Sequence, residues 1–424
     1  DQKSGIWKNE NIIINNKEND IFREFKTLSS SNDYFKEIIE ISDNFKFRDF
    51  VVSKNSDWSD IFYRNTNNFE NFEYNELNQT FLKGKKISKY KINDKILFKN
   101  DKAIITDLKG NIIIYSITEN RIVNKFNFYR KKLRKINISL NIILENSVVY
   151  VSDNIGFLYA YNIDNNKVIW AKNYKVPFRS NLKITKNNLI AANQNNNLYF
   201  FNKFDGEIIT LIPTEDTPVK NEFINNLALN SRNLFFLNTY GSLYSIDKSK
   251  MKIKWFSNLN QSLDINPSNL FFGNQIISYK DKLVISSNKQ LYIINENNGS
   301  IIFKKNFFSS IKPLVVNDYI FLITNNDLII AMDLIDGKII YSYDLNRKIS
   351  EFLNTKKKMA KFRSLIMANS KIYVFLNNSY YLKMDLNGDI EAIKKIPSKL
   401  NSDPILINGS LFFLDQKNRL NIFN

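Results

Sequence analysis

The sequence predicts an all-β protein, an eight-bladed β-propeller whose blades are four-stranded antiparallel sheets. Three observations support this prediction. A short motif recurs along most of the 424 residues, each copy follows further short apolar segments, and the last copy stops one strand short at Asn424. A repeat of roughly 40 to 50 residues that holds four strands is typical of a propeller blade.

The clearest copy of the motif runs from Gly156 to Trp170. Its aromatic and β-branched part, residues 157–163, suits a half-buried pleated surface, and residues 164–167 form a polar turn before the returning strand. Further copies begin at Gly110, Asn196, Gly241, Lys289, Asn326, Asn378 and Asn418. We interpret the aspartates that recur at the turns as structural: Asp164, Asp247, Asp333 and Asp385.

The ring has to close, because the last copy holds only three strands and an unpaired sheet edge invites aggregation. The alternating segment Lys86–Ile92 lies directly before the first full blade. We therefore expect this segment to supply the outermost strand of the last blade and to fasten the circle.

Two regions are expected along the chain. Residues 1–57 lack the repeat and are predicted to form an N-terminal tether that packs on the outside of the ring, and residues 58–424 form the propeller. The propeller region opens with the aromatic-rich segment Trp58–Asn68, which we interpret as a plug over one face or side of the ring. The longest insertion, residues 345–363, is strongly basic, and inserted loops are where functional variation collects.

Composition excludes several kinds of chemistry. The chain has no Cys and no His, so it forms no disulfide, no Cys/His zinc site, no Cys nucleophile and no Ser-His-Asp triad. No run of 18 apolar residues is present, so no helix is expected to span a membrane. The net charge of +18 favours anionic partners, but Lys and Arg are scattered rather than arranged with aromatic residues along a groove, so we expect no nucleic-acid partner.

The repeat Gly-x-Leu-Tyr-Ala-x-Asp…Gly…Trp resembles that of the quinoprotein alcohol dehydrogenases, which bind pyrroloquinoline quinone and Ca²⁺ at the propeller axis. In this chain only Trp170 and Trp255 hold the Trp position, and no compact set of Glu, Asn and Asp can be assigned. We therefore expect no enzyme activity, no cofactor and no metal. A quinoprotein-type dehydrogenase is the first alternative, and a basic propeller that binds nucleic acid or anionic lipid is the second.

Two stretches resemble the BamB family, the lipoproteins of outer-membrane β-barrel assembly. Trp58 followed by Arg64–Asn68 resembles the Trp-x-x-x-Gly-Gly-Asn element in front of the first blade, although the glycines are missing. The stretch Val176–Asn202, which begins Val-Pro-Phe-Arg-Ser, is similar to the third blade of the family and the loop that leads into it. The resemblance covers about residues 58 to 424.

This resemblance implies a non-catalytic scaffold of the β-barrel assembly (BAM) machinery, which binds a POTRA module of BamA and helps to deliver or insert outer-membrane proteins. By position, Phe178 and Arg179 match the hydrophobe-Arg pair through which the family docks. Glu222 falls near the first acidic position of the following loop, and Ile224 replaces the second. Phe178 is expected to act as a buried anchor, and Arg179 offers a planar fork of donors to a carboxylate or to carbonyls.

The resemblance also implies where the protein acts and with what. It predicts a monomeric propeller within a complex at the periplasmic face of the outer membrane, with BamA and other BAM components as partners. A lipidated Cys in front of Asp1 would anchor it, and this anchor would be its only membrane contact. We also expect its exposed strand edges or concave surface to receive unfolded β-segments by strand pairing.

Overall fold

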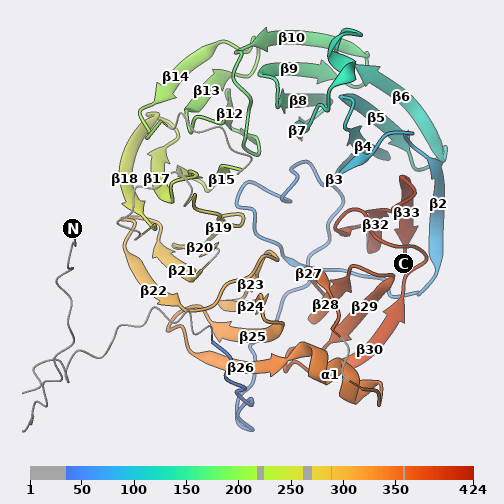
Figure 1. Cartoon of the computed structure of the whole chain (residues 1–424), viewed down its shortest axis with the longest axis vertical. Coiled ribbons are helices and arrows are strands. Elements are labelled where there is room, and N and C mark those ends of the chain that lie inside the picture. Colours follow the sequence, from blue (N-terminus) through green and yellow to red (C-terminus); the bar gives the residue numbers. More distant parts are fainter. Residues whose placement is uncertain (1–34, 217–223, 261–269, 288, 357–358) are drawn as a thin grey trace, which may run out of the picture. The chain divides into compact units, whose positions relative to one another are not determined.

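Eight β-sheets stand around a common axis in the computed structural model, as Figure 1 shows. The structure describes residues 35–216, 224–260, 270–287, 289–356 and 359–424. In seven sheets four antiparallel strands follow one another in sequence order, with the first strand nearest the axis and the last at the rim (Figure 1), and one of these sheets carries a short fifth, parallel strand. In the remaining sheet the rim strand comes from the part of the chain before the first blade. The eight-bladed propeller predicted from the repeat is therefore confirmed.

The first four blades follow one another along the chain. The first consists of β3 (Ile92–Lys99), β4 (Lys102–Asp107), β5 (Asn111–Ser116) and β6 (Arg121–Asn127). The second consists of β7 (Leu140–Glu145), β8 (Val148–Asp153), β9 (Phe157–Asn162) and β10 (Lys167–Asn173). The third consists of β11 (Lys183–Ile184), β12 (Asn188–Ala192), β13 (Leu198–Asn202) and β14 (Ile208–Ile212). The fourth consists of β15 (Asn226–Leu229), β16 (Asn233–Leu237), β17 (Ser242–Asp247) and β18 (Lys252–Asn258).

The last four blades complete the ring. The fifth consists of β19 (Ile277–Tyr279), β20 (Lys282–Ser286), β21 (Leu291–Asn295) and β22 (Ile301–Lys305). The sixth consists of β23 (Leu314–Val316), β24 (Tyr319–Ile323), β25 (Leu328–Asp333) and β26 (Ile339–Asp344). The seventh consists of β27 (Phe362–Ala368), β28 (Lys371–Leu376), β29 (Tyr380–Met384) and β30 (Ile390–Lys395), with the short β1 (Asn71–Phe72) parallel to β27. The eighth consists of β31 (Ile405–Ile407), β32 (Ser410–Leu414), β33 (Arg419–Phe423) and β2 (Thr80–Lys86).

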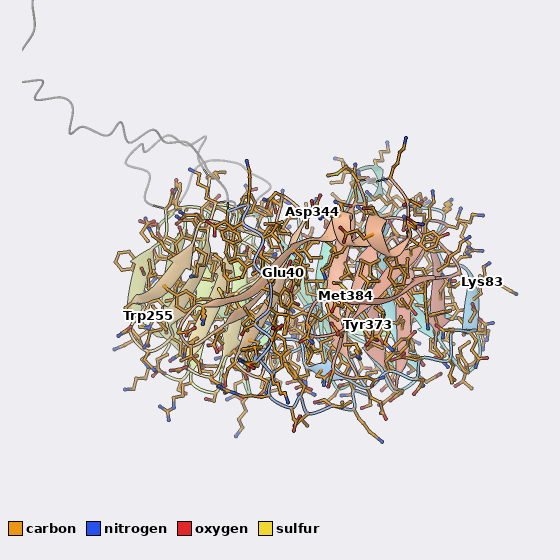
Figure 2. The ribbon with its side chains drawn as sticks, turned by 90° about the horizontal axis from the view of Figure 1, so that it is seen from below. Glu40, Lys83, Trp255, Asp344, Tyr373 and Met384 are labelled. Carbon is orange, nitrogen blue, oxygen red and sulfur yellow. The ribbon has the colours of Figure 1, made fainter. Side chains whose placement is uncertain are left out.

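The strand sequences explain where each strand lies. Middle strands are covered on both faces by neighbouring blades, so they are apolar almost throughout, as in β16, where all residues are buried. Rim strands have one solvent-exposed face, so exposed and partly buried side chains alternate along them. In β18, exposed lysines alternate with Ile253 and Trp255. Lys83 on β2 and Trp255 on β18 lie at opposite edges of the ring (Figure 2). The core is thus a series of apolar layers between blades.

The two repeat tryptophans join neighbouring blades. The indole N–H of Trp170 on β10 donates to the carbonyl of Lys203, 2.9 Å away, and its ring lies against Gly206 in the next blade. Trp255 on β18 repeats the contact with Glu296 and Gly299. Because each glycine has a positive φ and no room for a Cβ, the Gly…Trp pattern of the sequence reflects this packing.

Replacing Gly206 by alanine is expected to destabilise the fold by about 2 to 3 kcal/mol, because the new Cβ would lie 2.4 Å from the Trp170 ring in a left-handed backbone conformation. Gly388→Ala is a matched control with a similar φ but ring atoms at 3.0 Å, so its loss is expected to be about 1 kcal/mol. Urea unfolding measures both. Equal losses would show that the Trp170 contact adds nothing to the backbone cost.

The ring is closed by an N-terminal strand, as predicted, but by a different segment. β2 pairs antiparallel with β33, with Leu82 opposite Ile422 and Lys86 opposite Arg419. The expectation that Lys86–Ile92 forms this strand is wrong by about six residues. Gly84 explains why the strand lies here, because an added Cβ there would lie 2.9 Å from the Leu420 carbonyl, so this close approach to β33 requires glycine. From Ile87 on, the chain leads toward β3 at the axis.

The segment before the plug lies against the sixth blade. Ile39 forms an antiparallel bridge with Ser342 on the rim strand β26, and Phe47 and Phe50 pack against Tyr319. The compact unit that holds the propeller begins at Phe35. The boundary expected at residue 57 stays a prediction.

The basic insertion contains the helix α1 (Leu345–Phe352), whose N-terminus is capped by Asp344 accepting from the Arg347 N–H at 2.9 Å. In the described part of the chain, no helix has the length and apolar character needed to cross a membrane.

One of the recurring aspartates differs from its expected role. Asp247 and Asp333 bind backbone N–H groups of the turns after the third strands, as predicted. In the Gly156 copy, Asn162 has that role, and Asp164 instead pairs with Lys102 of the preceding blade at 2.8 Å.

Candidate functional site

A segment of irregular backbone occupies the centre of the ring, and we call residues 55–72 the plug (Figure 1). It contacts the innermost strands of all eight blades. Its backbone bonds reach the first, second, fourth, fifth and seventh blades, through Trp58 to Phe98, Ser59 to Leu144, Asn65 to Leu229, Thr66 to Ser278, and Phe72 to Asn369. Side chains reach the other three, through Asp60 to Lys183, Asn68 to Val315, and Asn55 to Leu406. The aromatic plug expected from Trp58–Asn68 therefore lies in the channel itself.

Aromatic rings fill the plug's interior. Trp58 is buried, and its ring centroid lies 4.7 Å from that of Tyr63 and 5.5 Å from that of Phe69. Phe72 completes the cluster, 5.1 Å from Tyr63. These large rings give the plug a core of its own, which makes it a structural part of the ring.

One buried ion pair holds the plug to the third blade. Lys183 on β11 is 0% exposed, and its Nζ donates to Asp60 at 2.7 Å, to the Arg64 carbonyl at 3.1 Å and to the Asn67 side-chain oxygen at 2.5 Å. Burial lowers the pKa of Lys183, and the charge of Asp60 offsets part of that effect. With all three donors used, the ammonium is satisfied.

Asn67 extends this contact to two further blades. Its side-chain N–H groups donate to the carbonyls of Leu227 and Ile276, both at 2.9 Å. This network could not be read from the sequence, because Lys183 stands among many lysines. Its only distinguishing signal is its position between two apolar residues at the start of an inner strand.

The Phe-Arg pair predicted to bind a partner lies in the loop between β10 and β11. Phe178 is 2% exposed and packs inside the propeller against Tyr174 and Phe201, with ring centroids 6.2 and 6.1 Å away. Its N–H donates to the Asp153 carbonyl at 2.9 Å. Phe178 therefore anchors the loop between the second and third blades. Its side chain is not at the surface.

Arg179 follows this anchor. Its N–H donates to Ala192 at 3.0 Å, and its carbonyl accepts from Asn225 at 2.7 Å, so its backbone is fixed from both sides. The buried Nε has no hydrogen-bond partner among the described residues. The loop thus holds a half-buried guanidinium on a fixed backbone.

The acidic half of the predicted site is only partly visible. Glu222 lies outside the described residues. Ile224, which stands at the second acidic position, is 57% exposed and directly precedes Asn225, the residue bonded to Arg179. The structure therefore brings Arg179 and the segment around Ile224 together, and partner binding by Phe178, Arg179 and Glu222 stays a prediction.

Rim strands on one side of the ring expose apolar side chains. Exposed residues include Ile169 on β10, Ile209 and Leu211 on β14, Phe256 on β18, and Ile302 on β22. The rim strand of the sixth blade shows what such an edge accepts, since Ile39 pairs with it in antiparallel fashion. Open rim edges thus combine unpaired backbone groups with apolar side chains.

The axis offers no set of ligands for a hard cation. Within the described ranges, no three carboxylates gather closely enough to hold a metal ion. The plug occupies the channel, and its one deeply buried carboxylate, Asp60, is engaged by Lys183. The quinone and Ca²⁺ of the quinoprotein alternative therefore have no carboxylate cluster to bind among the described residues.

Comparison with known proteins agrees with this architecture. A family model described as outer membrane protein assembly factor BamB matches residues 135–343. BamB from Moraxella catarrhalis superposes with a TM-score of 0.62 at 14% identity, covering 81% of this chain and 100% of that one. A europium-containing methanol dehydrogenase gives a TM-score of 0.60 at 8% identity, covering 87% and 89%. No curated protein matches the sequence.

The fold and its tryptophan contacts define a β-propeller built of PQQ-like repeats. Within that class, residues 135–343 match the BamB family model, and the fold resembles that of BamB from Moraxella catarrhalis.

Proposed function

We propose that this propeller is a non-catalytic scaffold of the BAM machinery, which binds a POTRA module of BamA and helps to deliver or insert outer-membrane proteins. It would act at the periplasmic face of the outer membrane, held there by a lipid anchor in front of Asp1. The family match to BamB supports this proposal, and residues 135–343 include the Phe178-Arg179 loop.

The observation that carries the proposal is the state of Arg179. Its backbone is fixed on both sides, while the buried Nε has no partner in the described residues. The side chain as a whole is only half-buried, so a carboxylate or carbonyl supplied by a partner would gain a charge-assisted hydrogen bond from the exposed part of the guanidinium at little ordering cost. Phe178 contributes indirectly, because its packing sets the position of the loop.

The open rim suggests how unfolded substrates are received. We infer that an extended, apolar β-segment pairs with β14, β18 or β22, as Ile39 pairs with β26. Main-chain hydrogen bonds would supply affinity without strict sequence demands, which suits a scaffold that serves many clients.

Arg179→Glu is expected to abolish recovery of BamA when the full chain is used for pull-down from solubilised membranes. The reversed charge would repel the acceptor and remove the donor fork, so a loss of at least tenfold is expected. Arg232→Glu is the matched control, because Arg232 is exposed in the turn before β16. The proposal fails if both variants recover BamA as the wild type does.

The likeness to a methanol dehydrogenase supports one alternative, a quinoprotein activity. Addition of pyrroloquinoline quinone and Ca²⁺, followed by an assay for alcohol-dependent dye reduction, separates it from the scaffold. Turnover above that of the free cofactor would favour the enzyme.

A further inference from the structure

A small cavity of about 50 Å³ lies beside the plug. Its walls come from the plug, through Trp58 and Phe69, and from residues of the fifth to eighth and first blades, including Gln275, Lys312 and Ser364. This volume has room for a few water molecules or for one ion of about three or four heavy atoms.

Four buried polar atoms of residues that line the cavity lack hydrogen-bond partners in the described part of the chain. They are the Trp58 Nε1, the Lys312 Nζ, the Ser364 Oγ and the Gln275 Oε1. Trp58 is 1% and Ser364 is 8% exposed. Since folded proteins pair roughly nine in ten buried polar groups, four unpaired atoms around one cavity point to a missing ligand.

Among the described residues, one cation of the cavity, Lys312, forms no ion pair with a carboxylate. Of the neighbouring cations, Lys183 pairs with Asp60, Lys95 lies 3.4 Å from Asp94 and 3.8 Å from Asp403, and Arg363 lies 2.9 Å from Asp403.

Within the described residues, the contact given for the Lys312 Nζ is with the Phe69 ring, whose centroid lies 3.5 Å away. Burial drives the pKa of Lys312 well below its ordinary value, and the charge of Lys183 adds to that effect. An anion in the cavity would restore the charged form.

We propose that this cavity binds one small monovalent oxyanion of the carboxylate type, such as formate, acetate or bicarbonate. The N–H of Trp58, the ammonium of Lys312 and the O–H of Ser364 would donate to its oxygens. Gln275 would donate to the anion after rotation of its amide, or would accept from the O–H of bicarbonate. Bulky dianions are excluded by the volume of the cavity.

The bound ion would join the plug to three blades at once. Trp58 belongs to the plug, Gln275 leads into the fifth blade, Lys312 leads into the sixth, and Ser364 lies in the seventh. Binding is expected to take up a proton at Lys312. Affinity therefore falls as the pH rises above the lowered pKa of the free site, by up to about tenfold per pH unit.

The test is thermal unfolding of the full chain with sodium formate or acetate against sodium chloride at equal ionic strength. We expect a saturable rise of a few °C in Tm for the wild type, which is absent in Lys312→Met and weakened in Trp58→Phe. Lys54→Met, which removes an exposed charge away from the cavity, is expected to respond as the wild type does. Calorimetric titration in buffers of different ionisation enthalpy is expected to show proton uptake.

Several outcomes would overturn the proposal. A response equal to that of chloride would mean that the cavity holds water only, and equal responses of wild type and Lys312→Met would mean a surface effect. If Lys312→Met does not fold, the wild-type proton uptake and the Trp58→Phe titration decide. If formate binds without proton uptake and its affinity is unchanged in Trp58→Phe, the ion binds outside this cavity.

Discussion

Lys183→Met is expected to lower the free energy of unfolding by about 3 to 5 kcal/mol, because it leaves the Asp60 carboxylate buried without its partner. Asp60 is 6% exposed, and Lys183 also donates to Arg64 and Asn67, so three acceptors lose one donor group together. Urea unfolding followed by tryptophan fluorescence measures the change.

The double variant Asp60→Asn/Lys183→Met separates the charge from the packing. It removes the unpaired charge, so we expect it to recover most of the loss, short of the part due to Arg64 and Asn67. Lys280→Met, which breaks the exposed pair with Asp318, is the matched control and is expected to cost less than about 1 kcal/mol. If Lys183→Met costs no more than this control, the plug is not held by the ion pair.

The second large effect is expected at the closure. Leu82 and Ile422 are buried and face each other between β2 and β33, and the chain contains no other Cys that could mispair. A disulfide between Leu82→Cys and Ile422→Cys would close a loop around nearly the whole ring. The oxidised form is expected to be more stable than the reduced form by about 4 kcal/mol, since the cross-link restricts the unfolded chain.

Comparing the two redox states of one protein removes the cost of losing two apolar side chains. The single variant Leu82→Cys is the control for thiol effects, and mass spectrometry confirms that the bond has formed. Equal denaturation midpoints for the disulfide-bonded and reduced forms would show that the pairing of β2 with β33 does not limit the stability of the ring.

The repeat was enough to predict the blades, because strand period, turn residues and the Gly…Trp spacing all report the same packing. It also predicted that an N-terminal strand closes the ring. The position of that strand could not be read, since the alternation of Lys86–Ile92 looks as favourable as that of β2, and only the close approach of Gly84 to Leu420 decides between them.

The site was harder to predict for a physical reason. Phe178 was expected at a partner surface, but apolar side chains in a tight loop serve equally well as internal anchors, and here Tyr174 and Phe201 cover it. Lys312 and Lys183 look like ordinary surface lysines in the sequence. What distinguishes them is the plug, which comes from a distant part of the chain and removes them from water.

The plug and β2 both precede the blades in the sequence, and this order has a consequence for biosynthesis. Trp58, Phe69 and Phe72 leave the ribosome before any of the blades that later surround them, and β33, the partner of β2, is made after all the other strands of the ring. The circle can therefore be completed only after β33 has been translated. Until then the cover of these aromatic groups is incomplete, so the nascent chain depends on being kept from premature association.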